Sequence, residues 1–360
     1  MRTGPTDVIR DDLREIAARA EEDLGWFDGK RVLVTGGAGF LMSYLVDALA
    51  ARAETTSDAP RVVVVDDFTT AGRDRLAHLA SHPHVELREA DAATLEIDEP
   101  FDVIVHGASI ASPVAYRRMP LRTLEVTALG TLALLRAVRE KPLAAFVLLS
   151  TSEIYGDPDP AHVPTPETYP GLVSSTGPRA CYDESKRFAE TLAVVHFQTY
   201  GTPVRIVRPF NVYGPGLRPD DGRAVPSLVD DARHGRDLVL HSDGRPRRSF
   251  CYVSDFLVSF LRVIARGADG EAYNVGDDRE EIAMRELADR IQAVTQAPGR
   301  VVVRTSADPH YLTDNPQRRC PDLAKLRALG GSMPCVSLEE GIARYARWCA
   351  AAERAGGTTR

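Results

Sequence analysis

The sequence predicts an α/β fold, a doubly wound and mostly parallel sheet with a smaller C-terminal lobe. Short apolar runs alternate with stretches of helical periodicity from residue 31 to residue 209, as they do in βαβ units. The apolar runs are continuous, which fits strands covered on both faces. Beyond residue 209 the chain becomes rich in Gly, Pro and Arg and its elements become short and irregular, which indicates a loop-rich second lobe.

The predicted elements follow in chain order. Residues 7–24 have the spacing of an amphipathic helix, which we expect to pack on the domain surface or against a partner subunit. Six strands are predicted at 31–35, 62–66, 84–91, 101–109, 145–151 and 204–209, with long helices at 121–140 and 182–201. We expect three parts: a helical extension at 1–28, a cofactor domain at 29–209 to which 248–275 return, and a substrate lobe formed by 210–247 and 276–350.

The composition excludes several classes of protein. The chain has 44 Lys and Arg residues against 51 Asp and Glu residues, a net charge of −7. This charge argues against a protein that binds nucleic-acid backbones. The five cysteines are scattered without CxxC spacing, so we predict no metal site and reduced thiols in a cytoplasmic protein. Apolar runs long enough for a signal peptide or a membrane span are absent, so we expect no membrane association.

A glycine turn follows the first predicted strand. In TGGAGF, Gly36 and Gly39 separate a strand from a helix, where a dinucleotide pyrophosphate can approach the backbone and the helix N-terminus. This is the signature of a Rossmann domain, and Phe40 and Ala108 complete the predicted turn region of the cofactor site. A third glycine would fall at residue 42, where this chain has Met42. We expect the methionine to push the helix outward or to shift the turn.

The second predicted strand ends in a carboxylate. Asp66 is placed to accept hydrogen bonds from the adenosine ribose and to repel a 2′-phosphate, so NAD is predicted rather than NADP. Arg73 lies nearby in the sequence and makes that preference less than absolute. Asp91 ends the third strand, and we expect it near the adenine.

Tyr182 and Lys186 are four residues apart on a predicted helix, so their side chains share one face. A lysine ammonium beside a phenol favours the phenolate, which could take a proton from a sugar hydroxyl as hydride leaves. The fifth strand ends in hydroxyls and a carboxylate that could assist as hydrogen-bond donor and second acid or base. These are Thr151, Ser152 and Glu153.

The chain resembles the extended short-chain dehydrogenases/reductases, also called the NAD-dependent epimerase/dehydratase family. The resemblance covers residues 30–348 and is closest to the UDP-glucuronate decarboxylases (UDP-xylose synthases). It rests on motifs that occur in the family's order: TGGAGF, HGAS, STSEIYGDP, GPRACYDESKRFAETL, VRPFNVYGP, DDGRAVP, RSFCYVSD and NPQRRCPD. Dehydratases of this family usually have Asp-Glu where this chain has Ser152-Glu153, and 4-epimerases usually lack the glutamate.

The resemblance implies a mechanism and a set of site residues. Tyr182, helped by Lys186 and Thr151, would deprotonate the C4 hydroxyl of a UDP-uronic acid while NAD takes hydride. The resulting 4-keto acid would lose carbon dioxide near Ser152 and Glu153, and hydride would then return to C4. The resemblance also implies a homodimer formed through the helices at 121–140 and 182–201. It assigns contacts with the nucleotide sugar to Asn211, Arg223, Arg248 and Arg319.

Some positions depart from the family pattern and leave alternatives open. Thr127 stands where the family usually has asparagine, and His241 and Ser242 replace an aromatic residue and a glycine in the base-binding strand. A 4-epimerase or a 4,6-dehydratase is the alternative within the family. A non-catalytic NAD-binding protein is the alternative of another class, although such a protein would not need a general base.

Overall fold

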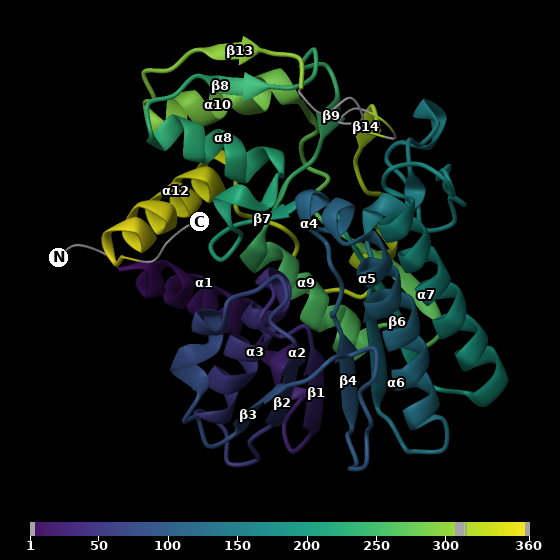
Figure 1. The fold of residues 1–360 in the computed structure, drawn as a ribbon. Coiled ribbons are helices and arrows are strands. Elements are labelled where there is room, and N and C mark those ends of the chain that lie inside the picture. The colour runs from purple at the N-terminus through teal and green to yellow at the C-terminus, as the bar shows by residue number, and fades with distance from the viewer. Residues whose placement is uncertain (1–3, 307–312, 314, 357–360) are drawn as a thin grey trace.

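The computed structural model describes residues 4–306, 313 and 315–356, and a parallel seven-stranded sheet forms its larger part (Figure 1). The strand order is β11-β6-β5-β4-β1-β2-β3, the doubly wound order of a dinucleotide-binding domain. This confirms the predicted fold class. The strands are β1 (Arg31–Thr35), β2 (Arg61–Asp66), β3 (Val85–Glu89), β4 (Val103–His106), β5 (Ala145–Leu149), β6 (Val204–Pro209) and β11 (Glu271–Val275).

Helices cover both faces of this sheet because its strands are apolar on both. In β1, Val32 and Val34 join one hydrophobic cluster, whereas Leu33 joins the other. The first cluster includes residues of α3 (Phe40–Ala53) and α9 (Val253–Arg266), and the second includes residues of α6 (Gly130–Val138) and α7 (Ala180–Tyr200). The continuous apolar runs therefore predicted the two-sided burial correctly.

Two predicted helices are interrupted in the structure. The stretch predicted at 121–140 consists of α5 (Pro120–Leu124), a π-helical turn η2 (Glu125–Leu129) and α6. The N-terminal helix is divided at Ala20 into α1 (Pro5–Arg19) and α2 (Glu21–Gly25). A π turn inserts one residue into the helical register, which the periodicity of a sequence does not reveal.

The second lobe lies across the carboxyl ends of the large sheet (Figure 1). Three small sheets, β10-β7, β12-β9-β14 and β13-β8, support it. Its strands are β7 (Val212–Tyr213), β8 (Leu238–Leu240), β9 (Arg247–Arg248), β10 (Cys251–Tyr252), β12 (Ile282–Ala283), β13 (Val301–Val303) and β14 (Arg318–Arg319). Its helices are α8 (Ala224–Arg233), α10 (Met284–Thr295) and α12 (Leu338–Arg354), and α4 (Pro113–Arg118) lies between the two lobes. Helix α11 (Ala324–Ala328) lies against β11 at the edge of the large sheet.

The N-terminal helix α1 is fastened by buried polar contacts. The Asp12 carboxylate is inaccessible to solvent and accepts hydrogen bonds from the hydroxyls of Tyr44 on α3 and Tyr252 on β10, both at 3.0 Å. Arg344 of α12 pairs with the same carboxylate at 3.1 Å. Helix α1 therefore joins the cofactor domain to the C-terminal helix. Among the described residues, the helices are too short or too polar to cross a membrane.

Candidate active site

The turn after β1 has the geometry expected of a pyrophosphate site. Gly36 has φ +70°, and a Cβ there would lie 2.7 Å from the backbone of Ala108. Gly39 caps α3 without a side-chain hydrogen bond, so the first N–H groups of this helix remain available for an anion. Gly36, Gly39 and Ala108 all line one small pocket, and Phe40 lines the larger cavity beside it.

Met42 packs against Gly107 at the end of β4. Its side chain is buried and its Cγ would lie 2.4 Å from a Cβ at Gly107. The absent side chain of Gly107 therefore provides the space for the methionine. The expectation that Met42 pushes the helix outward or shifts the turn stays a prediction.

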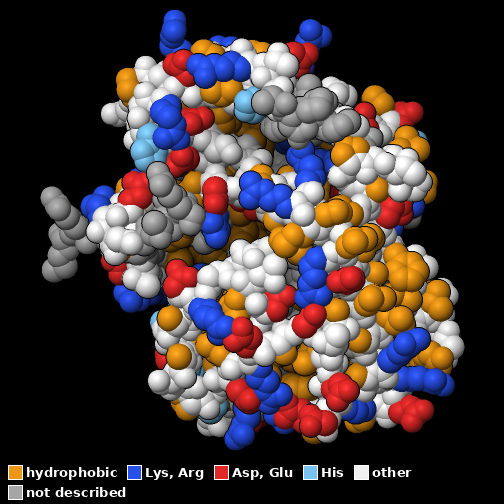
Figure 2. Space-filling model, in the orientation of Figure 1, with side chains coloured by type: hydrophobic (Ala, Val, Ile, Leu, Met, Phe, Trp, Pro, Cys, Tyr) orange, Lys and Arg blue, Asp and Glu red, His pale blue; other side chains and the backbone are white. Residues whose placement is uncertain are grey.

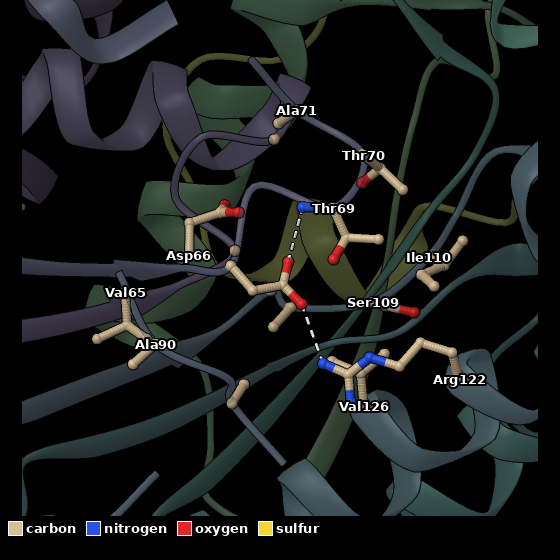
Figure 3. Close-up of a pocket in the computed structure, with 16 residues that line it drawn as sticks. Val65, Asp66, Thr69, Thr70, Ala71, Ala90, Ser109, Ile110, Arg122 and Val126 are labelled. Atoms are coloured by element: carbon tan, nitrogen blue, oxygen red, sulfur yellow. Dashed lines mark hydrogen bonds and ion pairs between the residues drawn. The ribbon is translucent and has the colours of Figure 1, made fainter. Parts of the chain in front are cut away.

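The small pocket forms the adenosine end of the site, and Figure 3 shows its lining. Asp66 is buried there and accepts hydrogen bonds from the N–H groups of Ala38 (2.9 Å) and Phe68 (2.8 Å). Burial raises the pKa of this carboxyl, while the two N–H donors oppose the rise. Both donors are backbone groups, so the carboxylate is fixed at the strand end with lone pairs remaining for ribose hydroxyls.

Asp91 does not line this pocket itself, but its neighbours Ala90 and Ala92 do. Its carboxylate lies 2.7 Å from the guanidinium of Arg122, which does line the pocket. The sequence analysis missed Arg122. The sequence around a basic residue on a predicted helix does not reveal which strand ends it will contact.

The larger cavity, about 530 Å³ in volume, runs from the glycine turn to the second lobe. The sequence-predicted residues that line it come from segments far apart in the chain. They are Gly36, Gly39, Phe40, Thr151, Ser152, Glu153, Tyr182, Lys186, Asn211, Arg223, Arg248 and Arg319. His241 and Ser242 also line it beside Val239 of β8. The fold thus brings the cofactor turn, the acid–base pair and the arginines into one space.

Tyr182 and Lys186 occupy the first turns of α7, where the helix meets the end of β5. The Lys186 ammonium donates a hydrogen bond to the Leu149 carbonyl at 2.7 Å and lies 6.0 Å from the centroid of the Tyr182 ring. Burial lowers the pKa of Lys186 to about 7, with Glu190 opposing the change. Burial also raises the pKa of Tyr182, against a hydrogen bond with Thr151 and the charge of Arg223. In the protein alone, desolvation therefore outweighs the groups that favour the phenolate.

Tyr116 of α4 stacks on Tyr182, with ring centroids 5.2 Å apart and planes 6° from parallel. Its ring is buried, and its hydroxyl has no hydrogen-bond partner among the described residues. It lines the larger cavity, so a ligand hydroxyl or carboxylate could satisfy it. The sequence analysis did not select this residue, which stands at the end of SPVAY without a motif of its own.

Thr127 contacts the loop that follows β4. The hydroxyl of Thr127, on the π turn η2, lies 2.9 Å from the hydroxyl of Ser109 in the loop after β4. Thr127 is fully buried. Its side chain therefore links the helix to the cofactor loop, through a hydroxyl partner.

Glu153 is held between two arginines. Arg179 and Arg319 both pair with its carboxylate, Arg319 through two hydrogen bonds. Burial favours the protonated form, but Arg179, Arg319 and the charge of Arg248 outweigh it and lower the pKa of Glu153 to about 2. The arginines therefore favour the ionised form of Glu153. The sequence analysis missed Arg179.

The other predicted substrate contacts lie around the same cavity. Arg248 is buried and donates to the Pro316 carbonyl at 2.5 Å and to the side chain of Asn315 at 3.1 Å. Burial and the charge of Arg319 lower the pKa of Arg248 to about 9. Arg223 pairs with Asp221 at 3.1 Å, and Asn211 donates a hydrogen bond to the Ser249 carbonyl at 2.8 Å.

Residues 32–276 match the sequence profile described as "NAD dependent epimerase/dehydratase family". The match spans more than half of the chain. This chain belongs to the NAD-dependent epimerase/dehydratase family. The predicted family is confirmed, and its description names the cofactor that the glycine turn and Asp66 predicted.

Relatives in this family carry more specific names. UDP-glucuronic acid decarboxylase 2 of Arabidopsis thaliana is 39% identical over 317 residues, covering 87% of this chain and 67% of the relative. UDP-glucuronic acid decarboxylase 1 of Xenopus tropicalis is 38% identical over 88% of this chain and 71% of its own. A dTDP-glucose 4,6-dehydratase from Streptomyces venezuelae, solved with NAD bound, has a TM-score of 0.77 at 30% identity, covering 91% of this chain and 98% of that one.

Membership in the family agrees with the chemistry of the adenosine pocket and the glycine turn. A Cβ at Gly36 would lie 2.7 Å from the backbone of Ala108, so glycine at this position lets the turn pack against the loop after β4. Asp66 presents a carboxylate fixed by backbone donors at the neighbouring strand end. These residues fit an adenine dinucleotide that carries unmodified ribose hydroxyls.

Proposed function

We propose that this protein is an NAD-dependent nucleotide-sugar decarboxylase that converts a UDP-uronic acid, with UDP-glucuronate as the first candidate, through a 4-keto intermediate. The observation that carries the proposal is the arginine cluster opposite Tyr182. Arg179, Arg248 and Arg319 gather around Glu153, and Arg179 also lies 3.5 Å from the carboxylate of Asp183, so three guanidinium groups face two carboxylates. The net positive charge of this cluster favours the binding of an anionic ligand. A sugar carboxylate is a suitable ligand because guanidinium groups bind carboxylates bidentately.

The residues of the site divide the reaction between them. Tyr182 accepts the proton of the C4 hydroxyl, and Thr151, hydrogen-bonded to Tyr182, orients that hydroxyl. NAD, when bound, supplies the acceptor for the C4 hydride and later returns it. Lys186 is held at the end of β5 by the Leu149 carbonyl, which places its charge beside the phenol ring.

The uronate that has been oxidised at C4 is a β-keto acid. Its C5–carboxylate bond breaks, carbon dioxide leaves, and the electron pair is taken up as an enolate at the C4 oxygen. Tyr182 can protonate or hydrogen-bond that oxygen. C5 then needs a proton, and Glu153 with Ser152 lies on the side of the arginine cluster to direct it. When a sugar carboxylate engages Arg179 or Arg319, the hold of these residues on Glu153 weakens and its pKa rises towards the usual range.

The relatives' names and the site point to the same product class. The test is the mass of the product after incubation with UDP-glucuronate and NAD. Loss of carbon dioxide supports the proposal. No change in mass would indicate a 4-epimerase, loss of water a dehydratase, and absence of turnover with retained NAD binding a non-catalytic protein.

We also propose a homodimer that pairs through α5, α6 and α7. Large apolar side chains are exposed on α5, on η2 and on α7, and Figure 2 shows hydrophobic side chains gathered over this part of the surface. They are Leu121, Leu124, Leu129, Phe188 and Val195. Leu135 of α6 is buried in the subunit's own core. Light scattering at micromolar concentration tests the dimer, and a monomer would refute it.

A cytoplasmic location is part of the same proposal. The five cysteines are unpaired in the structure, and free thiols are typical of a reducing compartment. Fractionation of cells that express the tagged full chain would test it.

A further inference from the structure

Arg122 of α5 connects two loops at the adenosine end of the site. One of its guanidinium nitrogens lies 2.9 Å from the Asp67 carboxylate and 2.7 Å from that of Asp91. Asp67 follows β2 and Asp91 follows β3, so a single nitrogen joins the loops on the two sides of the adenosine pocket. In Figure 3 the Arg122 side chain reaches from its helix towards the loop that carries Thr69.

The charges around this pocket are unevenly compensated. Asp67 is partly buried, and its second oxygen accepts a hydrogen bond from the Thr69 N–H at 2.9 Å. Arg122 is the one basic residue among those that line the pocket, against the two acidic residues Asp66 and Asp67. Since Arg122 is already shared between Asp67 and Asp91, the negative charge of Asp66 remains without a basic partner.

Arg73, the other basic residue that the sequence places near Asp66, has different partners. Its guanidinium lies 4.4 Å from the centroid of the Phe68 ring and pairs with Glu89. It does not line the pocket. A 2′-phosphate in this pocket would therefore meet the carboxylates of Asp66 and Asp67. The guanidinium of Arg122 already pairs with Asp67 and Asp91.

We propose that Arg122 is a positioning and specificity-determining residue for the adenosine half of the cofactor. It fixes the separation of the two loops and sets the net charge of the pocket, because it partly neutralises Asp67 and Asp91 while Asp66 keeps its charge to accept ribose hydroxyls. The inference rests on the proposed function in one respect, that the site binds NAD.

The experiment measures binding of NAD, NADP and UDP to the full-length protein by calorimetry, without sugar substrate. Arg122→Ala leaves two facing carboxylates uncompensated, so we expect NAD affinity to fall about tenfold or more. NADP affinity should fall further, since the pocket gains net negative charge. UDP binding in the second lobe should change little. Arg118→Ala, on the exposed end of α4 outside the pocket lining, is the matched control.

A second variant should change the preference for NAD over NADP in the opposite direction. Asp67→Asn removes one carboxylate from the pocket and leaves Arg122 with Asp91 and Glu125, so the preference for NAD over NADP should narrow. A purely structural role of Arg122 would weaken both dinucleotides in parallel in both variants and would overturn the proposal. Unchanged NAD affinity in Arg122→Ala, or an equal loss of UDP binding, would overturn it as well. The product-mass test is independent of these measurements, so failure of the decarboxylase proposal is distinguishable from failure of this one.

Discussion

The side chain of Met42 occupies the space that any side chain at residue 107 would need. A Cβ at Gly107 would lie 2.4 Å from Met42 Cγ and 2.8 Å from its sulfur. Met42 follows the pyrophosphate turn, and Gly107 follows β4 at the same edge of the sheet. The two residues form a size-complementary pair in the wall of the cofactor site.

This relationship predicts mutual rescue. Gly107→Ala should cost about 1–3 kcal/mol of stability by overpacking and weaken NAD binding, and Met42→Ala should cost about 2–5 kcal/mol by leaving a cavity. The double variant should be more stable than the sum of the two changes predicts, by about 0.5–3 kcal/mol, and should partly recover NAD affinity. Urea unfolding and NAD titration measure both effects. Strict additivity would show that the two side chains do not share this space.

Tyr182→Phe removes only the hydroxyl of the proposed base. Because general acid–base assistance is typically worth about 10²–10⁴-fold, turnover should fall by at least that factor. NAD affinity should be nearly unchanged, since the glycine turn and Asp66 supply those contacts. Tyr200→Phe at the exposed end of α7 is the control. Near-normal turnover of Tyr182→Phe on the true substrate would refute the mechanism.

Glu153→Gln should separate oxidation at C4 from the later steps. Tyr182 remains in place, so absorbance of reduced cofactor should appear and persist while release of carbon dioxide and of the final product falls. Arg179 and Arg319 lose their shared counter-ion, so the KM for an anionic sugar should decrease as kcat decreases. Glu184→Gln on α7, whose carboxylate is 3.7 Å from Arg187, provides the control. Equal losses of oxidation and of product would contradict a late role for Glu153.

The buried carboxyl of Asp12 should make the free energy of unfolding depend on pH. Burial raises its pKa to about 6, against hydrogen bonds from Tyr252 and Tyr44 and the charge of Arg344. The fold therefore favours the protonated carboxyl, and this contribution is complete below pH 4 and is lost as the pH rises through about 6. A shift of about two units corresponds to about 3 kcal/mol.

Asp12→Asn does not titrate, so the wild type should lose stability relative to this variant between pH 4 and pH 6. The difference should be constant above pH 7. Urea unfolding of both proteins across this range measures it. Parallel pH profiles would show that Asp12 keeps its ordinary pKa in the fold.

Much of the site was predictable because its signals are local. The TGGAGF turn requires the backbone freedom of Gly36, the carboxylate of Asp66 ends an apolar strand, and four-residue spacing places Tyr182 and Lys186 on one helix face. The structure places Tyr182 and Lys186 together with the predicted arginines around one cavity. Arg122, Tyr116 and Arg179 were missed because they belong to the site through contacts with residues distant in sequence.

The sequence by itself determined the alternation of strands and helices, the doubly wound fold class and the functional groups at the strand ends. These features depend on local periodicity and backbone conformation. The tertiary structure alone decided how side chains share space and charge. It placed Met42 over Gly107, bound Arg122 to two loops and held Glu153 between Arg179 and Arg319. Packing and electrostatics depend on which residues the fold makes neighbours, and that information is absent from any single segment of the chain.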